Sequence, residues 1–474
     1  MATVRRSVSM AAAALCLAAS ASAAGAAGDA LGRRQLSPLL RAGEDVLAPS
    51  KVGPLPGINA SSYSGFFEVN ATAHASLFFW YWPALSGNAS APLLVWLQGG
   101  PGSSSLFGML VELGPFRVTT PDLQPAYNPD SWAGEYSVVF VDNPRGTGYS
   151  FTDNGTLCTD WQCYGEDFDS FLRQFVQAYG LQANDVYITG ESYGGHYVPA
   201  SAFTVHEGNA AGRQPFVNLR GIAVGNGFVA PAEMSAGYAD AIYNAGLISW
   251  DDYAVAQSYV ANISARLAAD DTVGAYRVWD AFLNGDTTPG GAWFTNVTGL
   301  TNYFNIANDP GMAFSYFETW VTSAAVRAAI GVGSQPYADG NVAVEIALEA
   351  DVMYSQRPRV EALLQSAAPR YKVLIYNGAL DIICGAPLTE RYIALLDWPG
   401  STAFAATRRA VWLDPQFTDG TVSGYVRAAA SAQAGLLVQA VVRGGGHMVP
   451  FDQPSRALDL ITRFVGGSFG GEDE

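Results

Sequence analysis

The sequence predicts an α/β fold in which a mostly parallel central sheet carries an inserted, largely helical cap. Short apolar runs typical of buried strands recur before residue 230 and again after residue 348. The intervening residues 231–348 show helical stretches separated by loops. A serine flanked by glycines also stands between a strand pattern and a helix pattern, at residues 190–194. Strands that alternate with helices in this way favour a parallel sheet with helices on its faces.

The expected strands fall into one group before the cap and another after it. They cover residues 76–84, 91–97, 136–144, 185–190, 220–228, 371–378 and 435–446, and the last of these is the final strand in chain order. Residues 166–180 predict a helix, because their apolar side chains share one face: Phe168, Phe171, Leu172, Phe175, Val176 and Tyr179. We therefore divide the chain into a first core part (51–230), the cap (231–348) and a second core part (349–474).

Composition and charge exclude several kinds of partner. The 474 residues are 49% hydrophobic, enough for a large core, and only 14% are charged, against about 25% in ordinary soluble proteins. The formal net charge is −17, whereas nucleic acids and anionic membrane surfaces attract basic patches. We therefore expect no nucleic-acid partner and no membrane partner. An acidic balance also suits a protein that works at low pH, where many carboxylates are partly neutralised.

The N-terminus has the features of a secretory signal. Two arginines precede an apolar, alanine-rich stretch, and small residues offer a cleavage point near Ala23 or Ala24. The alternatives are a transmembrane anchor or an alanine-rich disordered arm, but the apolar run is too short to span a bilayer. We expect residues 1–24 to be the signal and residues 25–50 to be an N-terminal lead or propeptide-like segment.

Glycosylation sequons also indicate passage through the secretory pathway. Six N-x-S/T sequons follow the predicted signal: Asn59, Asn70, Asn88, Asn154, Asn262 and Asn296. No later segment has the run of about 18 apolar residues that a membrane span needs. We expect the protein in the lumen of a lysosome or vacuole, or outside the cell.

The cysteines favour one small disulfide and no metal site. Cys158 and Cys163 lie close enough in sequence to close a disulfide loop in an oxidising compartment, although two unpaired surface thiols are the alternative. Cys384 is then the odd cysteine of the mature chain. With four histidines, no HExxH motif and no CxxC pair, the sequence gives little support for a metal. We expect neither a metal nor a cofactor.

A nucleophile elbow, G-x-S-x-G, occurs at Gly190–Gly194. The same pattern recurs at Gly466–Gly470, and a chain with 51 glycines makes such matches common. Context separates the two. Ser192 follows the strand pattern VYIT and precedes a helix-compatible stretch, as a strained strand-to-helix turn requires, whereas Ser468 follows a terminal helix pattern and enters a glycine-rich acidic tail. Ser192 is the predicted nucleophile.

The order Ser, Asp, His along the chain predicts an α/β-hydrolase fold. The base should follow the last strand, and only His447 among the four histidines does so. His196 lies within the helix that follows Ser192, which favours a packing or pocket role. The acid should end the preceding strand, where Asp381 stands; an ordinary turn aspartate is the alternative for this residue alone.

An oxyanion hole requires two backbone N–H groups that point at one position. Tyr193, the residue after the nucleophile, would supply one. Gly100, in the glycine-rich turn after the strand 91–97, would supply the other. A phosphate-binding loop is the alternative for this turn, but no GK[ST] follows it and no dinucleotide-binding fingerprint is present.

Six motifs in this order have counterparts in one family of enzymes: WLQGGPGSSS, VELGPF, NPDSWAGEYSVVFVDNPRGTGYSF, GESYGGHYVPA, YNGALDIIC and GGGHMVPFDQP. From about residue 50 to its C-terminus the chain resembles the serine carboxypeptidases, and most closely their vitellogenic-like branch. The resemblance implies that Ser192 is the nucleophile, His447 the base and Asp381 its orienting partner, with Gly100 and Tyr193 as the oxyanion hole.

The resemblance also implies a substrate site. Four residues would hold the terminal carboxylate of the substrate: Gln98, Gly99, Glu112 and Glu191. Val111 and Met448 would line an apolar pocket for the leaving residue, and Cys384 falls where many members keep an unpaired cysteine. The chain departs from the family pattern in two places, because Gln98 replaces the more common Asn and Ser103 replaces a cysteine that is usually disulfide-bonded. Most of the family's disulfides are absent, so its substrate preferences do not transfer to this chain.

The predicted function is removal of C-terminal residues from peptides or proteins at acidic pH. One alternative is acyl transfer to a small alcohol with the same triad, and another is a non-catalytic protective or binding partner on the same fold. A retained Glu112–Glu191 pair favours peptides, because an acyltransferase has no terminal carboxylate to recognise. Two carboxylates in one closed pocket cannot both ionise cheaply, so we expect the pair to share a proton and to bind the substrate in that state.

Overall fold

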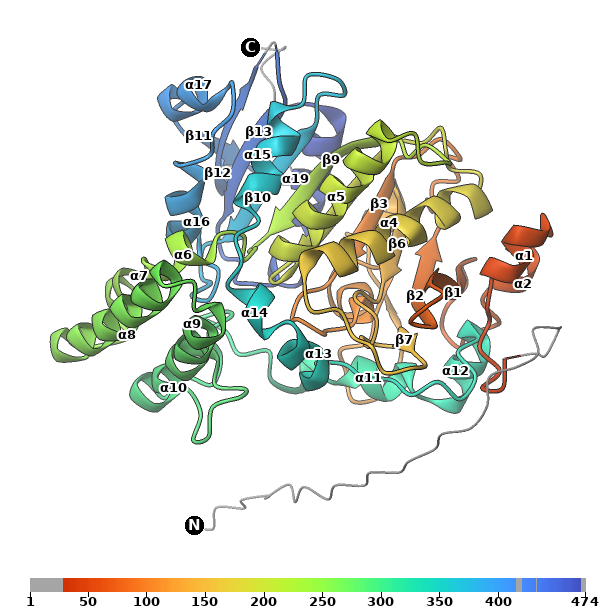
Figure 1. The fold of residues 1–474 in the computed structure, drawn as a ribbon, viewed down its shortest axis with the longest axis horizontal. Helices are drawn as coiled ribbons and strands as arrows, with labels where there is room; N and C mark the ends of the chain where they lie inside the picture. Colours follow the sequence, from red (N-terminus) through yellow and green to blue (C-terminus); the bar gives the residue numbers. More distant parts are fainter. Residues whose placement is uncertain (1–28, 415–419, 432, 470–474) are drawn as a thin grey trace.

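The computed structural model describes residues 29–414, 420–431 and 433–469 (Figure 1). The predicted signal, residues 1–24, lies outside the described residues. An 11-stranded sheet crosses the molecule in the order β1-β2-β6-β3-β8-β9-β10-β13-β12-β11, and β7 pairs with β2. The strands are β1 (Tyr63–Asn70), β2 (Ala75–Trp82), β3 (Leu93–Leu97), β6 (Ser137–Val141), β7 (Phe151–Thr152), β8 (Val186–Glu191), β9 (Leu219–Gly225), β10 (Lys372–Gly378), β11 (Ala410–Leu413), β12 (Val422–Ala430) and β13 (Leu436–Val442). A separate two-stranded ribbon joins β4 (Phe116–Arg117) to β5 (Ala126–Tyr127).

The centre of the sheet is parallel and its two edges are antiparallel. Strands β6, β3, β8, β9, β10 and β13 pair in parallel, whereas β1 and β2 at one edge and β12 and β11 at the other run antiparallel to their neighbours. Parallel strands buried on both faces appear in sequence as continuous apolar runs, which β3 (LLVWL) and β6 (SVVFV) illustrate. The prediction of a mostly parallel α/β sheet is confirmed.

Helices cover both faces of this sheet. Successive residues of β3 belong to different cores: Val95 packs in the cluster that includes α4 (Trp161–Ala178) and α5 (Gly194–Ala210), and Trp96 in the cluster that includes α19 (Pro454–Gly466). The predicted helix at residues 166–180 is confirmed as part of α4, and five of the six residues on its apolar face are fully buried. The sheet therefore holds the ends of β3, β8, β10 and β13 at fixed positions between two packed layers.

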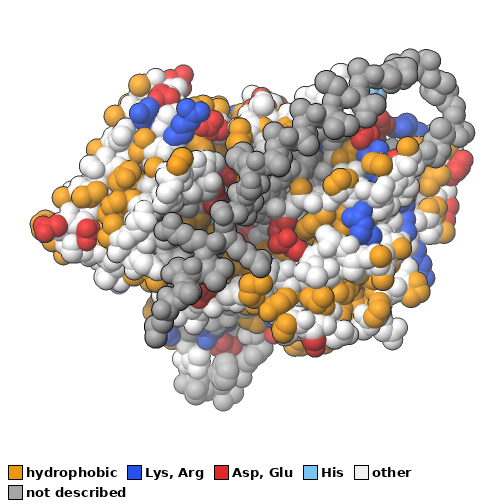
Figure 2. Space-filling model, turned by 90° about the horizontal axis from the view of Figure 1, so that it is seen from below, with side chains coloured by type: hydrophobic (Ala, Val, Ile, Leu, Met, Phe, Trp, Pro, Cys, Tyr) orange, Lys and Arg blue, Asp and Glu red, His pale blue; other side chains and the backbone are white. Residues whose placement is uncertain are grey.

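The remaining helices and turns surround the sheet. They are α1 (Ser37–Ala42), α2 (Leu47–Ser50), α3 (Ser105–Phe107), the π-helical turn Gly108–Glu112, the 3₁₀ turn Trp132–Gly134, α15 (Arg357–Gln365), α16 (Ala386–Ile393), α17 (Ser401–Ala406) and α18 (Val449–Asp452). Within the described residues, no helix is both long and apolar enough to cross a bilayer. The face drawn in Figure 2 carries acidic, basic and hydrophobic side chains in scattered positions.

The segment expected to form one cap occupies two places. The helices α6 (Pro231–Ser235), α7 (Tyr238–Asn244), α8 (Trp250–Ala268), α9 (Thr272–Trp279) and α10 (Trp293–Thr298) form a lobe beside one end of the sheet (Figure 1). In contrast, α11 (Tyr316–Val321) and α12 (Ala324–Ile330) lie near β1 and β2, where Trp320 stacks on Trp80 with ring centroids 6.3 Å apart. The chain then returns to the core through the loop after α12, followed by α13 (Val342–Ala347) and α14 (Glu349–Val352).

The described part of the predicted N-terminal lead is packed against the sheet. Leu36 is fully buried and its N–H donates to Phe66 O at 2.9 Å, so this segment lies along β1. Gly65 of β1 has no room for a Cβ, because Leu36 would lie 2.7 Å from it. Loss of residues 29–50 would therefore expose apolar core on this edge of the sheet.

Candidate active site

Ser192 occupies a sharp turn between β8 and α5. Its φ is +61°, a left-handed conformation that non-glycine residues rarely adopt and that is typical of strained functional sites. The neighbouring glycines allow the close approach that this turn needs: a Cβ on Gly190 would lie 2.5 Å from Leu97 O, and one on Gly195 would lie 2.5 Å from Phe228 N. Ser468, by contrast, is exposed after α19, and Gly470 of its motif lies outside the described residues.

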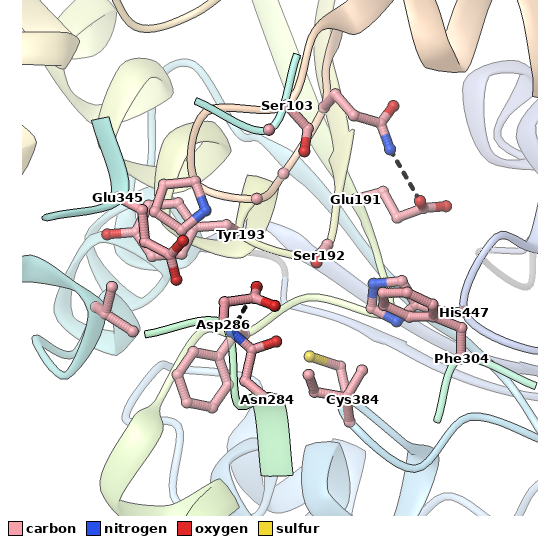
Figure 3. A pocket seen from close by; sticks show the side chains of 18 of the residues that line it. Ser103, Glu191, Ser192, Tyr193, Asn284, Asp286, Phe304, Glu345, Cys384 and His447 are labelled. Carbon is pink, nitrogen blue, oxygen red and sulfur yellow. Dashed lines mark hydrogen bonds between the residues drawn. The ribbon is translucent and has the colours of Figure 1, made fainter. Parts of the chain in front are cut away.

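His447 and Asp381 come together at the ends of β13 and β10. His447 Nδ1 and Asp381 Oδ2 are 2.8 Å apart, and both side chains are buried. Asp381 also accepts the N–H groups of Ile383 at 2.9 Å and Cys384 at 3.1 Å. These donors fix the orientation of the carboxylate. His447 Nε2 has no hydrogen-bond partner among the described residues, and Ser192 lines the same cavity (Figure 3).

Asn226 is a site residue that the sequence argument missed. Its Nδ2 donates to Asp381 Oδ2 at 2.7 Å, and its Oδ1 accepts Gly378 N–H at 3.0 Å. The residue is fully buried with a φ of +42° directly after β9. Asn226 lies near the end of a predicted strand that neighbours the strand before Asp381. This position is the sequence feature that could have identified it as a site residue. Asn226 holds Asp381 in place relative to the sheet.

The glycine-rich turn after β3 lies against Ser192. A Cβ on Gly99 would lie 2.5 Å from Ser192 Cβ and 2.6 Å from Tyr193 N, so only glycine fits there. Gly100 has a φ of +106°, and Ser103 N–H closes the turn on Gly99 O at 3.1 Å. Tyr193 is anchored through its hydroxyl, which donates to Asp351 Oδ2 at 2.7 Å. The predicted oxyanion-hole segments are therefore adjacent.

Buried hydrogen bonds fix the end of this turn. Asp142 accepts the Ser104 hydroxyl at 2.6 Å, Ser105 N–H at 3.0 Å and Tyr149 N–H at 2.8 Å. Burial raises the pKa of Asp142 to about 7. Ser104 N–H donates in turn to Asp339, which belongs to the predicted cap segment. The turn is thus held from both the core and the cap segment.

Glu191, Glu112 and Gln98 form one buried polar cluster beside Ser192. Gln98 Nε2 donates to Glu191 Oε1 at 3.1 Å and faces Glu112 Oε1 at 3.4 Å. Trp96 Nε1 donates to Gln98 Oε1 at 2.8 Å, which orients the amide. The two carboxyl groups contact each other, and among the described residues no other donor reaches their Oε2 atoms. Two carboxyl groups form a hydrogen bond only when one of them carries a proton.

Burial raises the pKa values of both carboxyl groups. The pKa of Glu112 rises to about 8, with burial as the main cause, opposed by its hydrogen bonds to Glu191 and Gln98. Burial and the neighbouring Glu112 raise the pKa of Glu191 well above its ordinary value. The cluster therefore holds protons at acidic pH.

A cavity of about 500 Å³ opens beside Ser192. Its lining includes Gln98, Gly99, Gly100, Glu191, Ser192, Tyr193, Cys384, His447 and Met448. Phe304, from the loop after α10, also lines it and lies 4.9 Å from the His447 ring. Glu112 lies behind Glu191 and does not line the cavity, and Val111 is fully buried in the core without reaching it. Met448 is thus the residue of the expected apolar pocket that faces this space.

His196 has a packing position. It is fully buried, its ring stacks on Tyr193 with centroids 4.3 Å apart, and burial lowers its pKa to about 4. It packs against Tyr193, the residue after Ser192, and does not line the cavity.

The cysteines form the expected small loop. Cys158 and Cys163 are joined, with an S–S distance of 2.07 Å, and Cys384 is a buried free thiol. Cys158, Cys163 and Asp167 are also close enough together to suggest metal ligands, but the disulfide removes both thiolates. Of the sequon asparagines, Asn70 is half-buried and the other five are exposed: Asn59, Asn88, Asn154, Asn262 and Asn296.

Comparison with known proteins agrees with this geometry. The family profile described as serine carboxypeptidase, Peptidase_S10, matches residues 53–467. The chain is 40% identical over 436 residues to the probable serine carboxypeptidase CPVL of Mus musculus, covering 91% of this chain and 88% of that protein. It is 34% identical over 438 residues to the vitellogenic carboxypeptidase of Aedes aegypti, covering 91% and 89%.

A solved structure shares the fold. The prohormone-processing carboxypeptidase KEX1(DELTA)P of Saccharomyces cerevisiae superposes with a TM-score of 0.76 at 21% identity, covering 89% of this chain and 96% of that one. At this identity the likeness supports the α/β-hydrolase fold with a helical insertion. The extent of the family match and the identities to its members show that the chain belongs to the serine carboxypeptidase family and is a serine-type carboxypeptidase.

Proposed function

We propose that this carboxypeptidase removes the C-terminal residue of peptides and proteins in acid, with Ser192, His447 and Asp381 as its catalytic residues. The observation that carries the proposal is one cavity lined by Ser192, His447 and Glu191, where burial raises the pKa of Glu191 and of Glu112 behind it. A serine nucleophile and a histidine beside it perform acyl transfer, and the carboxyl pair supplies a reason for the reaction to take place at a chain terminus.

In the first half of the reaction, Ser192 Oγ attacks the carbonyl carbon of the last peptide bond and His447 Nε2 accepts the hydroxyl proton. The N–H groups of Gly100 and Tyr193 would stabilise the resulting oxyanion. The C–N bond then breaks, and His447 gives its proton to the departing amino group. Asp381 keeps the histidine in the tautomer that leaves Nε2 free to accept a proton.

In the second half, water attacks the acyl-enzyme carbonyl and His447 accepts a proton from it. The Ser192 ester bond breaks, and the same proton returns to Ser192 Oγ. The products are the shortened peptide and a free amino acid, so the cycle consumes one water and needs no cofactor.

Recognition of the terminal carboxylate is assigned to Glu191, Glu112, Gln98 and Gly99. When both carboxyl groups are protonated, Glu112 donates a hydrogen bond to Glu191, and Glu191 donates its own proton to the substrate carboxylate. An ionised pair would repel the same group. This arrangement favours peptide hydrolysis over acyl transfer to an alcohol, because an acyl-transfer substrate has no terminal carboxylate to bind.

We also propose that the mature protein is a glycoprotein of the secretory pathway, residing in a lysosome or vacuole or outside the cell. The exposed sequon asparagines and the alanine-rich N-terminal stretch support this location. Acidic compartments of that pathway would also supply the pH at which the carboxyl pair keeps its protons.

The function is tested with two substrates that differ only at their C-terminus. An N-acylated dipeptide acid and its amide are compared as kcat/KM from pH 4.5 to 8.5, on wild type and on Glu191→Gln. The wild-type ratio of acid to amide should fall as pH rises toward 8, because only the acid substrate binds a terminal carboxylate to the protonated pair. Because both substrates use the same Ser192 and His447, effects of pH on these two residues cancel in the ratio.

Glu191→Gln should lower the acid-to-amide ratio at low pH and flatten its decline, since an amide donates at any pH. Ser192→Ala should abolish both reactions and covalent labelling by a fluorophosphonate, whereas Ser468→Ala should retain them. A ratio that stays constant with pH in wild type would refute the assigned role of Glu191. Labelling at Ser468 would refute the choice of nucleophile.

A further inference from the structure

The cavity beside Ser192 has an acidic wall that the mechanism above does not use. Three carboxylates from the predicted cap segment line it: Asp286, Asp339 and Glu345. Among the described lining residues there is no Lys and no Arg. Figure 3 shows Glu345 and Asp286 on the other side of Ser192 from Glu191. The cavity is therefore acidic on the side away from the groups assigned to the terminal carboxylate.

The three carboxylates are held by neutral donors. Glu345 Oε1 accepts the Tyr276 hydroxyl at 2.6 Å, and Asp286 Oδ2 accepts Asn284 Nδ2 at 2.9 Å. Asp339 Oδ1 accepts Ser104 N–H at 2.6 Å. Across residues 29–414, 420–431 and 433–469, none of the three forms an ion pair. No cation among the described residues pairs with them, and burial raises the pKa of all three carboxyl groups.

Of the three carboxyl groups, Glu345 and Asp286 are the two that can bind a cationic group of a ligand. Glu345 is only 8% exposed, and burial raises its pKa, with Asp286 and Asp280 adding like charge. Asp286 is exposed at the cavity wall. Asp339 is committed to the turn that carries Gly99 and Gly100. A cation placed between Glu345 and Asp286 would relieve their repulsion.

Two buried side chains of the same cavity each have one polar atom without a partner in the described part of the chain. Glu191 and His447 are 1% and 2% exposed, and Glu191 Oε2 and His447 Nε2 meet no other donor or acceptor among the described residues. Buried polar atoms left in this way mark positions where a ligand binds. A peptide that satisfies these atoms and places its carbonyl at Ser192 continues across Ser192 toward the acidic wall.

We propose that Glu345 and Asp286 form the subsite for a Lys or Arg side chain on the residue whose carbonyl Ser192 attacks. The proposal rests on the function proposed above. In that function the departing residue lies between Ser192 and Glu191, so the penultimate residue of the substrate lies on the opposite side, where the two acids are. Peptides with a basic penultimate residue are therefore the preferred substrates.

The test compares N-acylated dipeptides that end in Phe and carry Arg, Leu or Glu before it, at pH 6. The wild-type enzyme should prefer Arg over Leu by about tenfold or more in kcat/KM, and Glu should be the poorest. Glu345→Gln keeps the hydrogen bond with Tyr276 and removes only the charge, so the Arg-to-Leu ratio should fall by about tenfold. Asp286→Lys, at an exposed position, should move the preference toward the Glu peptide.

Two controls test whether a change in the Arg-to-Leu ratio comes from the charge of the acidic wall. Asp251→Asn makes the same charge change on the exposed start of α8, outside the cavity, and should leave the Arg-to-Leu ratio unchanged. A reversed dipeptide with Phe before a terminal Arg reports on the leaving-residue side, and its turnover relative to a peptide with Leu before Phe should be unaffected by Asp286→Lys. Fluorophosphonate labelling confirms that each variant is folded.

The outcomes separate the two proposals. If wild type cleaves none of the peptides, the proposed function fails and the subsite with it. If it cleaves the Arg and Leu peptides equally and Glu345→Gln leaves their ratio unchanged, the function stands and the subsite is refuted. If the variants change kcat/KM only for the peptide that ends in Arg, the two acids contact the leaving residue. The assignment to the penultimate residue is then wrong.

Discussion

Replacing Glu112 by Gln should change how the stability of the protein depends on pH. Burial raises the pKa of Glu112 from 4.5 to about 8, so the folded state keeps a proton that the unfolded chain releases. Stability from this group is therefore fully present below pH 4.5 and is lost as pH rises toward 8. Each pH unit in that range lowers the free energy of unfolding by about 1.4 kcal/mol. The loss between pH 5 and pH 8 is therefore on the order of 4 kcal/mol.

The assay is urea unfolding of wild type and Glu112→Gln at pH 5 and at pH 8. Gln keeps the size of the side chain and does not titrate, so the variant should lose several kcal/mol less of its unfolding free energy over this interval. Glu191 still titrates in the variant, which leaves part of the pH dependence in place. Glu135→Gln, at an exposed position, is the matched control and should behave as wild type. An equal loss in wild type and Glu112→Gln would refute the buried, protonated state of this carboxyl.

Two further predictions concern the turn and the glycans. Gly99→Ala should lower kcat/KM by at least about a hundredfold, because its Cβ would lie 2.5 Å from Ser192 Cβ and displace the nucleophile. Gly134→Ala, where an added Cβ meets nothing within 4 Å, should keep activity, and an equal loss in both would contradict the argument. Secreted protein should lack residues 1–24 and lose mass on enzymatic deglycosylation. Intact-mass spectrometry checks both points, and an unchanged mass with a retained N-terminus would rule out luminal residence.

The sequence predicted the centre of the fold and missed its edges. Strands β3, β6 and β8 were predictable because burial on both faces makes them continuous apolar runs. Strands β1 and β12 were missed, because each mixes a glycine and polar residues with apolar ones and resembles a loop in sequence. β1 is an edge strand and β12 lies next to the edge strand β11, and several residues of both are only partly buried, so their sequences are less constrained.

The same contrast holds within the site. Ser192, Asp381 and His447 each follow a predicted strand, so the parallel sheet brings them together without further information. Asn226 follows a strand as well, but asparagine in a turn has an ordinary structural explanation. Glu345 and Asp286 could not have been predicted, because they come from a long insertion whose path over the cavity depends on packing between distant segments. For Val111 the difference runs the other way. The resemblance predicts that it lines the pocket, but the structure buries it in the core.

A carboxyl group directly before the nucleophile is compatible with catalysis only if it is neutral. An ionised Glu191 would oppose the oxyanion that forms on the attacked carbonyl, in a site whose low dielectric strengthens that repulsion. Burial and Glu112 keep Glu191 protonated in acid, so at that pH it can donate to the substrate without opposing the reaction. When the pair ionises, the terminal carboxylate and the developing oxyanion are both repelled. The decline of kcat/KM with pH should therefore come from a lower kcat as well as a higher KM. For the amide substrate, which has no terminal charge, a lower kcat alone should cause the decline.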